Sequence, residues 1–312
     1  MILTITMNPS VDINYQLDSL QLDNVNRVST VSKTAGGKGL NVARVLSQLD
    51  ESVATTGLLG GTIGDYIKNQ LHDQKIPEKF MGIEKESRNC IAIIHDKGKQ
   101  TEVLESGPVI SEEEGQAFLK HLQTLLDDVK VVTISGSLPK GLPDDYYIDV
   151  IKKCNEKKID VVLDTSGNVL KNVLASPVKP FAIKPNMEEL EGLFSEAKDI
   201  TEETIASVLQ SEAFKGITCV LVSNGSKGSF VKWGEKTYKL GIPKVDAINP
   251  VGSGDATVAG LASALHKQKS IEEAMKTAMT TGVLNALNEK TGFIDADNFA
   301  SIFSQITVEE LN

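Results

Sequence analysis

The chain has 312 residues, of which 40% are hydrophobic and 24% charged, as in most globular proteins. Its 42 acidic and 32 basic side chains give a net charge of −10, which repels nucleic acid, so we expect no nucleic-acid partner. No run of 18 apolar residues is present, which argues against a membrane-spanning helix. Three widely spaced cysteines and four scattered histidines indicate neither a disulfide framework nor a zinc site, and we expect a cytoplasmic protein.

Short apolar runs alternate with segments of helical periodicity along the chain. In the first half, the pattern predicts a strand over 2–6, a helix over 39–49, a strand over 53–59, a helix over 112–126 and a strand over 129–135. In the second half, it predicts strands over 160–164 and 181–184, a helix opened by Asn186, strands over 218–223, 229–233 and 237–240, and helices over 255–266 and after Ser270. This order predicts an α/β fold with a mainly parallel sheet covered by helices on both faces.

Two segments interrupt the alternation of strands and helices. Residues 11–30 and 87–106 carry alternating strand patterns without crossover helices, and residues 96–99 are typical of a hairpin turn. We expect these segments to form a small antiparallel lid. Residues 1–312 are then one domain with a lid drawn from both segments.

The P-loop and dinucleotide-binding fingerprints are absent, so we look for a ligand site in the glycine-rich loops that precede helices. The strongest candidate for the catalytic loop is Asn249–Asp255. Gly252, Ser253 and Gly254 lead into a predicted helix, whose free N–H groups suit a transferring phosphate. Asp255 is either a general base for an attacking hydroxyl or only a helix cap. The paired glycines favour the base.

Two other glycine-rich loops are candidate ligand sites. The loop Gly36–Asn41 carries the charge of Lys38, and the amide of Asn41 suits sugar hydroxyls; the alternative is a plain turn with a solvated lysine. The loop Ser223–Gly228 follows a strand and is either a cradle for nucleotide phosphates or only a turn.

Isolated polar residues leave further alternatives open. Asn186 and Glu189 are either a helix-capping pair or a site that holds Mg²⁺ through its waters. Asp12 either binds sugar hydroxyls or is a solvated acid at a strand end. Arg27 and Arg88, in the lid segments, either clamp a phosphate or carry surface charge.

The loops Gly36–Asn41 and Asn249–Asp255 resemble the two signatures of the ribokinase-like (PfkB) sugar kinases. Further matches to the order and spacing of that family lie at Asn8-Pro9, 135–139, 184–186 and 223–228, so the resemblance covers essentially the whole chain. It implies a ribokinase-like fold and an ATP-dependent sugar kinase. Within the family, residues 88–93 and 249–260 are most similar to the tagatose-6-phosphate kinases, in the branch that also contains the 1-phosphofructokinases.

The resemblance implies a role for each candidate residue. Asp255 is the implied catalytic base, with an anion hole made by Gly252, Ser253 and Gly254. The implied substrate contacts are Asp12, Gly37, Lys38, Asn41, Arg88 and Ser137, with Arg27 near the phosphates. The implied ATP contacts are Lys184, Asn186, Ser223, Gly225, Gly228 and Asn285, and Glu189 holds Mg²⁺ through water.

The implied reaction phosphorylates tagatose 6-phosphate at carbon 1, as in lactose and galactose catabolism by the tagatose route. Phosphorylation of fructose 1-phosphate is the alternative, and a non-catalytic sugar-phosphate-binding regulator is a remote one. An oxidoreductase is disfavoured because the dinucleotide fingerprint is missing. Lids of this family often pair between subunits, so the resemblance implies a homodimer. Asn249-Pro250 stands where the family often has Asp-Thr beside a monovalent cation, so we expect no such cation here.

Overall fold

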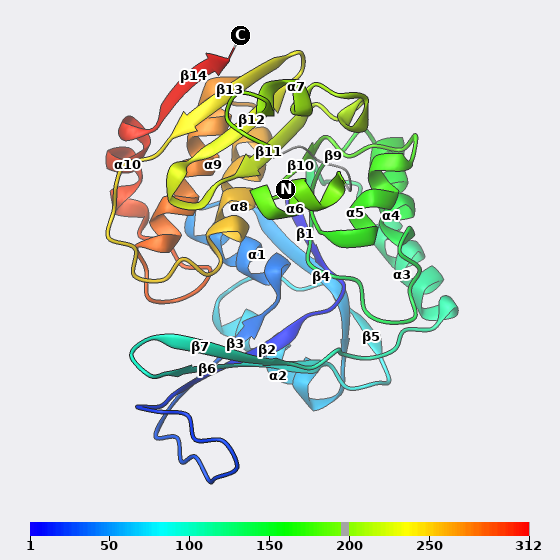
Figure 1. Cartoon of the computed structure of the whole chain (residues 1–312). Coiled ribbons are helices and arrows are strands. Elements are labelled where there is room, and N and C mark those ends of the chain that lie inside the picture. The colour runs from blue at the N-terminus through cyan, green and yellow to red at the C-terminus, as the bar shows by residue number, and fades with distance from the viewer. Residues whose placement is uncertain (195–199, 312) are drawn as a thin grey trace.

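The computed structural model describes residues 1–194 and 200–311. Most strands form a 10-stranded sheet in the order β14-β13-β12-β11-β10-β9-β8-β1-β4-β5 (Figure 1). These strands are β1 (Ile2–Thr6), β4 (Val53–Gly60), β5 (Met81–Ile83), β8 (Val131–Ser135), β9 (Asp160–Asp164), β10 (Ala182–Ile183), β11 (Cys219–Ser223), β12 (Ser229–Trp233), β13 (Lys236–Gly241) and β14 (Thr307–Leu311). Neighbours from β5 to β11 run parallel, whereas β12, β13 and β14 add antiparallel strands at one edge.

Helices cover both faces of this sheet (Figure 1). One face carries α1 (Lys38–Gln48), α2 (Gly61–Asp73), α8 (Ser253–His266), α9 (Ile271–Ala286) and α10 (Phe299–Gln305). The other carries α3 (Glu112–Leu125), α4 (Tyr146–Glu156), α5 (Gly167–Ala175), α6 (Met187–Leu193) and α7 (Ile205–Leu209). Short 3₁₀ turns complete the described elements: η1 (Glu212–Phe214), η2 (Gly225–Lys227) and η3 (Ala296–Asn298). No helix in the described ranges has the length and apolar character needed to cross a membrane.

The buried strand β1 shows why helices cover both faces of the sheet. All five of its residues are buried; Ile2 packs into the core beneath α1 and α8, whereas Leu3 and Ile5 pack into the core beneath α3 and α4. A strand that is buried on both sides is typical of a parallel sheet between two helical layers. The predicted α/β architecture is therefore confirmed.

Several elements were not predicted from the sequence pattern, among them β3 (Thr30–Gly36), α7, β5, β14, α2 and α10. β5 has only three residues, and β14 is a largely exposed strand, so neither shows a buried apolar run. α2 begins with Gly-Thr-Ile-Gly, residues that are poor helix formers. Tertiary packing, not local propensity, determines these elements.

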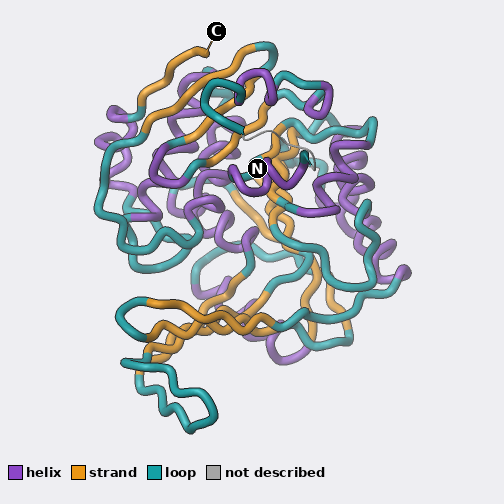
Figure 2. The backbone as a smooth tube through the Cα atoms, in the orientation of Figure 1, coloured by secondary structure: helices purple, strands orange, loops and turns teal. Residues whose placement is uncertain are grey.

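A second sheet lies apart from the first and forms the lid (Figure 2). Its order is β3-β2-β6-β7, with β2 (Ser10–Gln16), β3 (Thr30–Gly36), β6 (Arg88–His95) and β7 (Lys99–Leu104). The pairs β2–β3 and β6–β7 are antiparallel, but β2 and β6 run parallel, so the expectation of a wholly antiparallel lid is wrong. The reason is that β2 and β6 both enter the lid from the main sheet, with Ser10 opposite Arg88.

The segment between β2 and β3 also differs from the expected strand pattern. Residues 17–29 form a loop that projects beyond the lid sheet, drawn in blue in Figure 1. The strand prediction for residues 11–30 is therefore right for its first part only.

Candidate active site

The carboxyl ends of the central strands bring the glycine-rich loops together. Ser135 ends β8 and lies opposite Asp164, which ends β9, while Lys184 follows β10. α1 and α8 pack against each other on one face, so the loops that open them meet at the same edge. This is the edge at which open α/β sheets bind ligands.

Asp255 lies in the first turn of α8 and is only 6% exposed. Its Oδ2 accepts a hydrogen bond from Nδ2 of Asn41 on α1, at 2.8 Å. The N-cap position of α8 is Gly252, with φ of 83° and no side-chain capping bond. A β-carbon at Gly252 would also lie 2.7 Å from Cγ2 of Thr291. Asp255 is therefore not a helix cap, because its carboxylate bonds to another helix.

The environment of Asp255 suits a base. Burial, followed by the negative charge of Asp164, raises the pKa of Asp255 to about 6, against the opposing effects of Lys38, Asn41 and Lys184. A carboxylate with this pKa is ionised at neutral pH, yet it is a better proton acceptor than an ordinary aspartate.

Asp164 is a site residue that the sequence reasoning missed. Its side chain is buried, with Oδ2 3.2 Å from Nζ of Lys38 and Oδ1 3.4 Å from Nζ of Lys184. Burial favours the neutral acid, but the two lysines outweigh it and hold the pKa of Asp164 below its usual range. The only signal in the sequence was a charged residue at the end of an apolar run. Asp164 thus holds two cations where the loops before α1 and α8 meet.

The N-terminus of α8 faces one of these cations. A β-carbon at Gly254 would lie 3.2 Å from Nζ of Lys184, so glycine leaves room for the ammonium group beside the first helical turn. Free backbone N–H groups and an adjacent ammonium together make an anion site.

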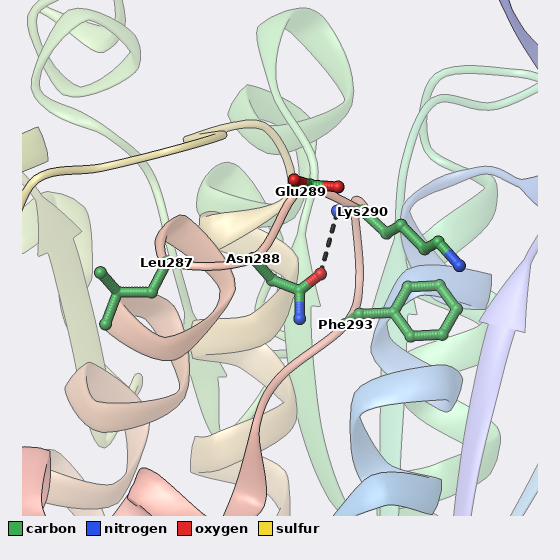
Figure 3. Close-up of a pocket in the computed structure, with 5 residues that line it drawn as sticks. All are labelled: Leu287, Asn288, Glu289, Lys290 and Phe293. Atoms are coloured by element: carbon green, nitrogen blue, oxygen red, sulfur yellow. Dashed lines mark hydrogen bonds between the residues drawn. The ribbon is translucent and has the colours of Figure 1, made fainter.

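Asn285, near the end of α9, forms hydrogen bonds to the residues that open α8. Its buried amide donates from Nδ2 to the Val251 carbonyl at 2.9 Å and to Oγ of Ser253 at 3.3 Å, and its Oδ1 accepts from the Gly292 N–H at 2.8 Å. A contact between Asn285 and adenine stays a prediction. A pocket lies at the loop after α9 and is lined by Leu287, Asn288, Glu289, Lys290 and Phe293 (Figure 3).

Asp12, on β2, lies at the base of the lid against the loop that opens α1. Oγ of Ser10 donates to its Oδ1 at 2.7 Å, and burial raises the pKa of Asp12. A β-carbon at Gly36 would lie 2.0 Å from the carboxyl carbon of Asp12, and Gly37, the N-cap residue of α1, has a φ of 103°. Asp12 is therefore not the solvated acid of the alternative interpretation.

Three predicted substrate residues lie outside this cluster. The guanidinium of Arg88 donates to the Asn8 carbonyl at 3.1 and 3.2 Å and to the Glu105 carbonyl at 2.9 Å, where the lid joins the main sheet. Ser137 is exposed after β8, and Arg27 is exposed in the projecting loop. Within the described ranges, neither Ser137 nor Arg27 has a side-chain hydrogen bond or ion pair to the cluster around Asp255.

The predicted ATP residues lie at neighbouring strand ends. Asn186 pairs with Ser223 through a parallel β-bridge, and Gly225 and Gly228 close the turn after β11 with positive φ. Asn186 also caps α6: the Glu189 N–H donates to its Oδ1 at 2.7 Å, and its own N–H donates to Oε2 of Glu189 at 2.9 Å. The capping alternative for this pair is therefore present in the structure.

The sequence model of the pfkB family of carbohydrate kinases matches residues 5–297. The chain belongs to the pfkB family. Kinases of this family transfer phosphate from ATP to a carbohydrate, so the coarse expectation of an ATP-dependent sugar kinase is confirmed.

Solved structures support the ribokinase-like fold of this pfkB kinase. A Staphylococcus aureus protein described as a candidate phosphofructokinase has a TM-score of 0.85 and 30% identity, over 100% of this chain and 99% of that one. Phosphofructokinase-2 of Escherichia coli has a TM-score of 0.90 and 24% identity, over 97% and 98%. A candidate 1-phosphofructokinase of Thermotoga maritima has a TM-score of 0.87 and 24% identity, over 100% of this chain and 99% of that one. The narrower resemblance to tagatose-6-phosphate kinases stays a prediction.

Proposed function

We propose that this pfkB kinase transfers the γ-phosphate of ATP to the carbon 1 hydroxyl of D-tagatose 6-phosphate, giving D-tagatose 1,6-bisphosphate. The observation that carries the proposal is the buried pair of Asn41 and Asp255 at the N-terminus of α8. An alcohol must lose its proton as its oxygen attacks phosphorus, and Asp255 is the group suited to accept it.

The reaction assigns a role to each part of the cluster. Asp255 takes the hydroxyl proton while the sugar oxygen bonds to the γ-phosphorus, and the bond from that phosphorus to the leaving ADP oxygen breaks. Of the predicted anion hole of Gly252, Ser253 and Gly254, the Ser253 N–H donates to the Pro250 carbonyl at 3.2 Å. The N–H groups of Gly252 and Gly254 and the ammonium of Lys184 are therefore the donors that stabilise the charge on the transferring group. Asp164 keeps the two lysines in place without entering the reaction.

The residues present fit a hydrated Mg²⁺ held mainly by ATP. The described residues contain no cluster of three acidic, histidine or cysteine side chains that would bind a metal alone. Oε2 of Glu189 is engaged in the cap of α6, and Oε1 is the atom that would hold a Mg²⁺-bound water. When bound, Mg²⁺ would neutralise phosphate charge.

The choice of sugar rests on the resemblance of residues 88–93 and 249–260 to the tagatose-6-phosphate kinases. A fructose phosphate is the second candidate, because the Staphylococcus aureus protein with 30% identity is described as a candidate phosphofructokinase. Fructose 1-phosphate already carries its phosphate on carbon 1. It would have to bind reversed, with the carbon 6 hydroxyl at Asp255.

A substrate panel tests the proposal, with kcat/KM measured for tagatose 6-phosphate, fructose 6-phosphate and fructose 1-phosphate at saturating ATP and Mg²⁺. We expect tagatose 6-phosphate to be best. Its carbon 4 epimer, fructose 6-phosphate, should be roughly 2- to 100-fold worse, because one or two hydrogen bonds are lost. We expect fructose 1-phosphate to be weakest. A preference for fructose 1-phosphate would overturn the choice of sugar, and no sugar-dependent ADP release would overturn the kinase.

A further inference from the structure

Arg44 lies one turn beyond Asn41 on α1 and was not among the predicted site residues. Its side chain is buried, with the residue 3% exposed. Nη1 donates to Oδ1 of Asn41 at 3.0 Å and to the Thr291 carbonyl at 3.3 Å. Nη2 donates to the Ala35 carbonyl at 2.6 Å, and Nε donates to Oε1 of Gln74 at 3.1 Å. One guanidinium thus joins α1, the end of the lid strand β3 and the loop after α9.

The acceptors of these four bonds are all neutral oxygens. A buried cation that forms no ion pair with them is costly, and burial lowers the pKa of Arg44 to about 10. Asp12 and Asp255 act on Arg44 through space and raise that pKa. The location of Arg44 is therefore better explained by the geometry that it imposes than by an ion pair.

The bond from Arg44 determines which way the amide of Asn41 faces. A guanidinium can only donate hydrogen bonds, so the amide oxygen of Asn41 must face Arg44. The amide nitrogen then faces Asp255, where it lies 2.8 Å from Oδ2. A donor in this place favours the ionised carboxylate, which is the form that accepts a proton.

We propose that Arg44 is a positioning residue, which holds the Asn41 amide with its nitrogen toward Asp255. The inference rests on the proposed role of Asp255 as the base. Without Arg44, the amide can turn over and present its oxygen to a protonated Asp255. The acid form would then be stabilised, and fewer molecules would carry a working base at a given pH.

Three other charged groups face Asp255, and Arg44 is bonded to none of them. They are Lys38 at the start of α1, Asp164 at the end of β9 and Lys184 after β10. The four described bonds of Arg44 go elsewhere, so replacing Arg44 leaves the Asp164 cluster intact.

The direct test is a carbon-13 NMR titration of the Asp255 carboxyl group, assigned by its loss in Asp255→Asn. We expect Arg44→Met to raise the pKa of Asp255 by about one unit, the scale of a lost hydrogen bond to a carboxylate. Arg44→Gln serves if Arg44→Met does not fold, because a glutamine amide does not fix the orientation of its neighbour. Gln74→Ala is the matched control: it removes a partner of Arg44 but not the bond to Asn41, and should leave the pKa unchanged.

The same titration in Asn41→Ala separates orientation from charge. If Arg44 acts through Asn41, adding Arg44→Met to Asn41→Ala should change the pKa of Asp255 far less than it does in the wild type. An equal shift in both backgrounds would mean a through-space effect and would overturn the proposal, as would no shift at all. Failure of the wild type to release ADP with any sugar phosphate would instead overturn the proposed function and leave the NMR result standing.

Discussion

Two buried carboxylates in the site are driven to opposite protonation behaviour by their neighbours. Asp164 is held between Lys38 and Lys184, and its pKa lies below the usual range. Asp255 bonds to a neutral amide, and burial raises its pKa to about 6. Pairs of acids whose pKa values are pushed apart mark the division between a permanent charge and a group that exchanges a proton.

Replacing Asp255 by Asn should lower kcat by about 10²- to 10⁴-fold, which is the usual contribution of a positioned base. Binding of ATP and sugar phosphate should be largely retained, because the side chain keeps its size. Steady-state kinetics and calorimetric titration of each ligand measure the two effects. A turnover within a few-fold of the wild type would contradict the assignment of the base.

Activity should depend on the protonation of Asp255 in a defined direction. Only the ionised carboxylate accepts a proton, so kcat/KM should rise with pH through about 6 and level off above it. A pH profile between about 5 and 8 measures this limb. A profile that is flat over the range, with saturating Mg²⁺ at every pH, would show that Asp255 is not the titrating base.

At the scale of elements, the helices that open at the site begin differently from three of the other helices. α3, α6 and α9 each begin with a full capping box, opened by Ser111, Asn186 and Ser270. The N-cap residues of α1 and α8 are Gly37 and Gly252, and neither helix has a side-chain capping bond. The first-turn N–H groups of Leu40 and Ser253 donate to the Gly37 and Pro250 carbonyls, whereas those of Gly254 and Asp255 have no described acceptor and are left for a ligand.

Two variants at the cap of α6 distinguish a structural role of Glu189 from a role in holding Mg²⁺. Glu189→Gln retains an oxygen that can accept the Asn186 N–H but loses the charge. We therefore expect little change in stability and a higher Mg²⁺ concentration for half-maximal activity. Asn186→Ala, the companion variant, removes the cap and should cost about 0.5–2 kcal/mol of folding free energy. An unchanged Mg²⁺ requirement in Glu189→Gln would leave Glu189 with the capping role alone.

At the scale of the whole molecule, the lid and the main sheet meet where Arg88 bonds to the Asn8 and Glu105 carbonyls. Both terminal nitrogens of Arg88 keep a second N–H that can bind a phosphate. The lid also exposes apolar side chains in its projecting loop, where Leu22 is 83% and Val25 is 68% exposed. Such side chains are typical of a surface that another molecule covers.

Arg88→Ala should raise the KM for the sugar phosphate far more than the KM for ATP, because a guanidinium in the lid suits a phosphate dianion. The loss of its bonds to two backbone carbonyls should also lower stability, by about 1–3 kcal/mol. Initial-rate kinetics with each substrate varied in turn, and denaturant unfolding, measure these effects. Equal changes in both KM values would show that Arg88 serves only the lid junction.

We propose that the chain is a homodimer joined through the lid. Light scattering after size-exclusion chromatography should give twice the 33.6 kDa chain mass for the wild type. Leu22→Asp should shift the protein toward monomer, because a buried charge without a partner opposes association. Glu289→Ala, on the pocket loop after α9, is a control away from the lid and should leave the mass unchanged. A wild-type monomer would contradict the proposal.

Features that depend on neighbouring residues could be predicted from the amino-acid sequence. The capping boxes at Ser111, Asn186 and Ser270 were readable because each joins residues three apart. The glycine-rich loops could be recognised because glycine is the residue that most easily adopts the positive φ found at the N-cap positions Gly37 and Gly252. The central strands could be predicted because a strand that is buried on both faces is mostly apolar, as in β9 and β11.

Which of these features lie next to each other could not be predicted from the sequence, because it depends on the packing of distant segments. Asn41 and Asp255 are 214 positions apart, and they bond because α1 and α8 pack on the same face of the sheet. Asp164 lies between Lys38 and Lys184 because strand order places β9 beside β10 and opposite the loop of α1. The sequence alone did not distinguish Arg44 from an exposed charged residue of a helix, because its burial and its bond to Asn41 depend on packing. Local patterns encode backbone geometry, whereas contacts between distant side chains follow from strand order, register and helix packing.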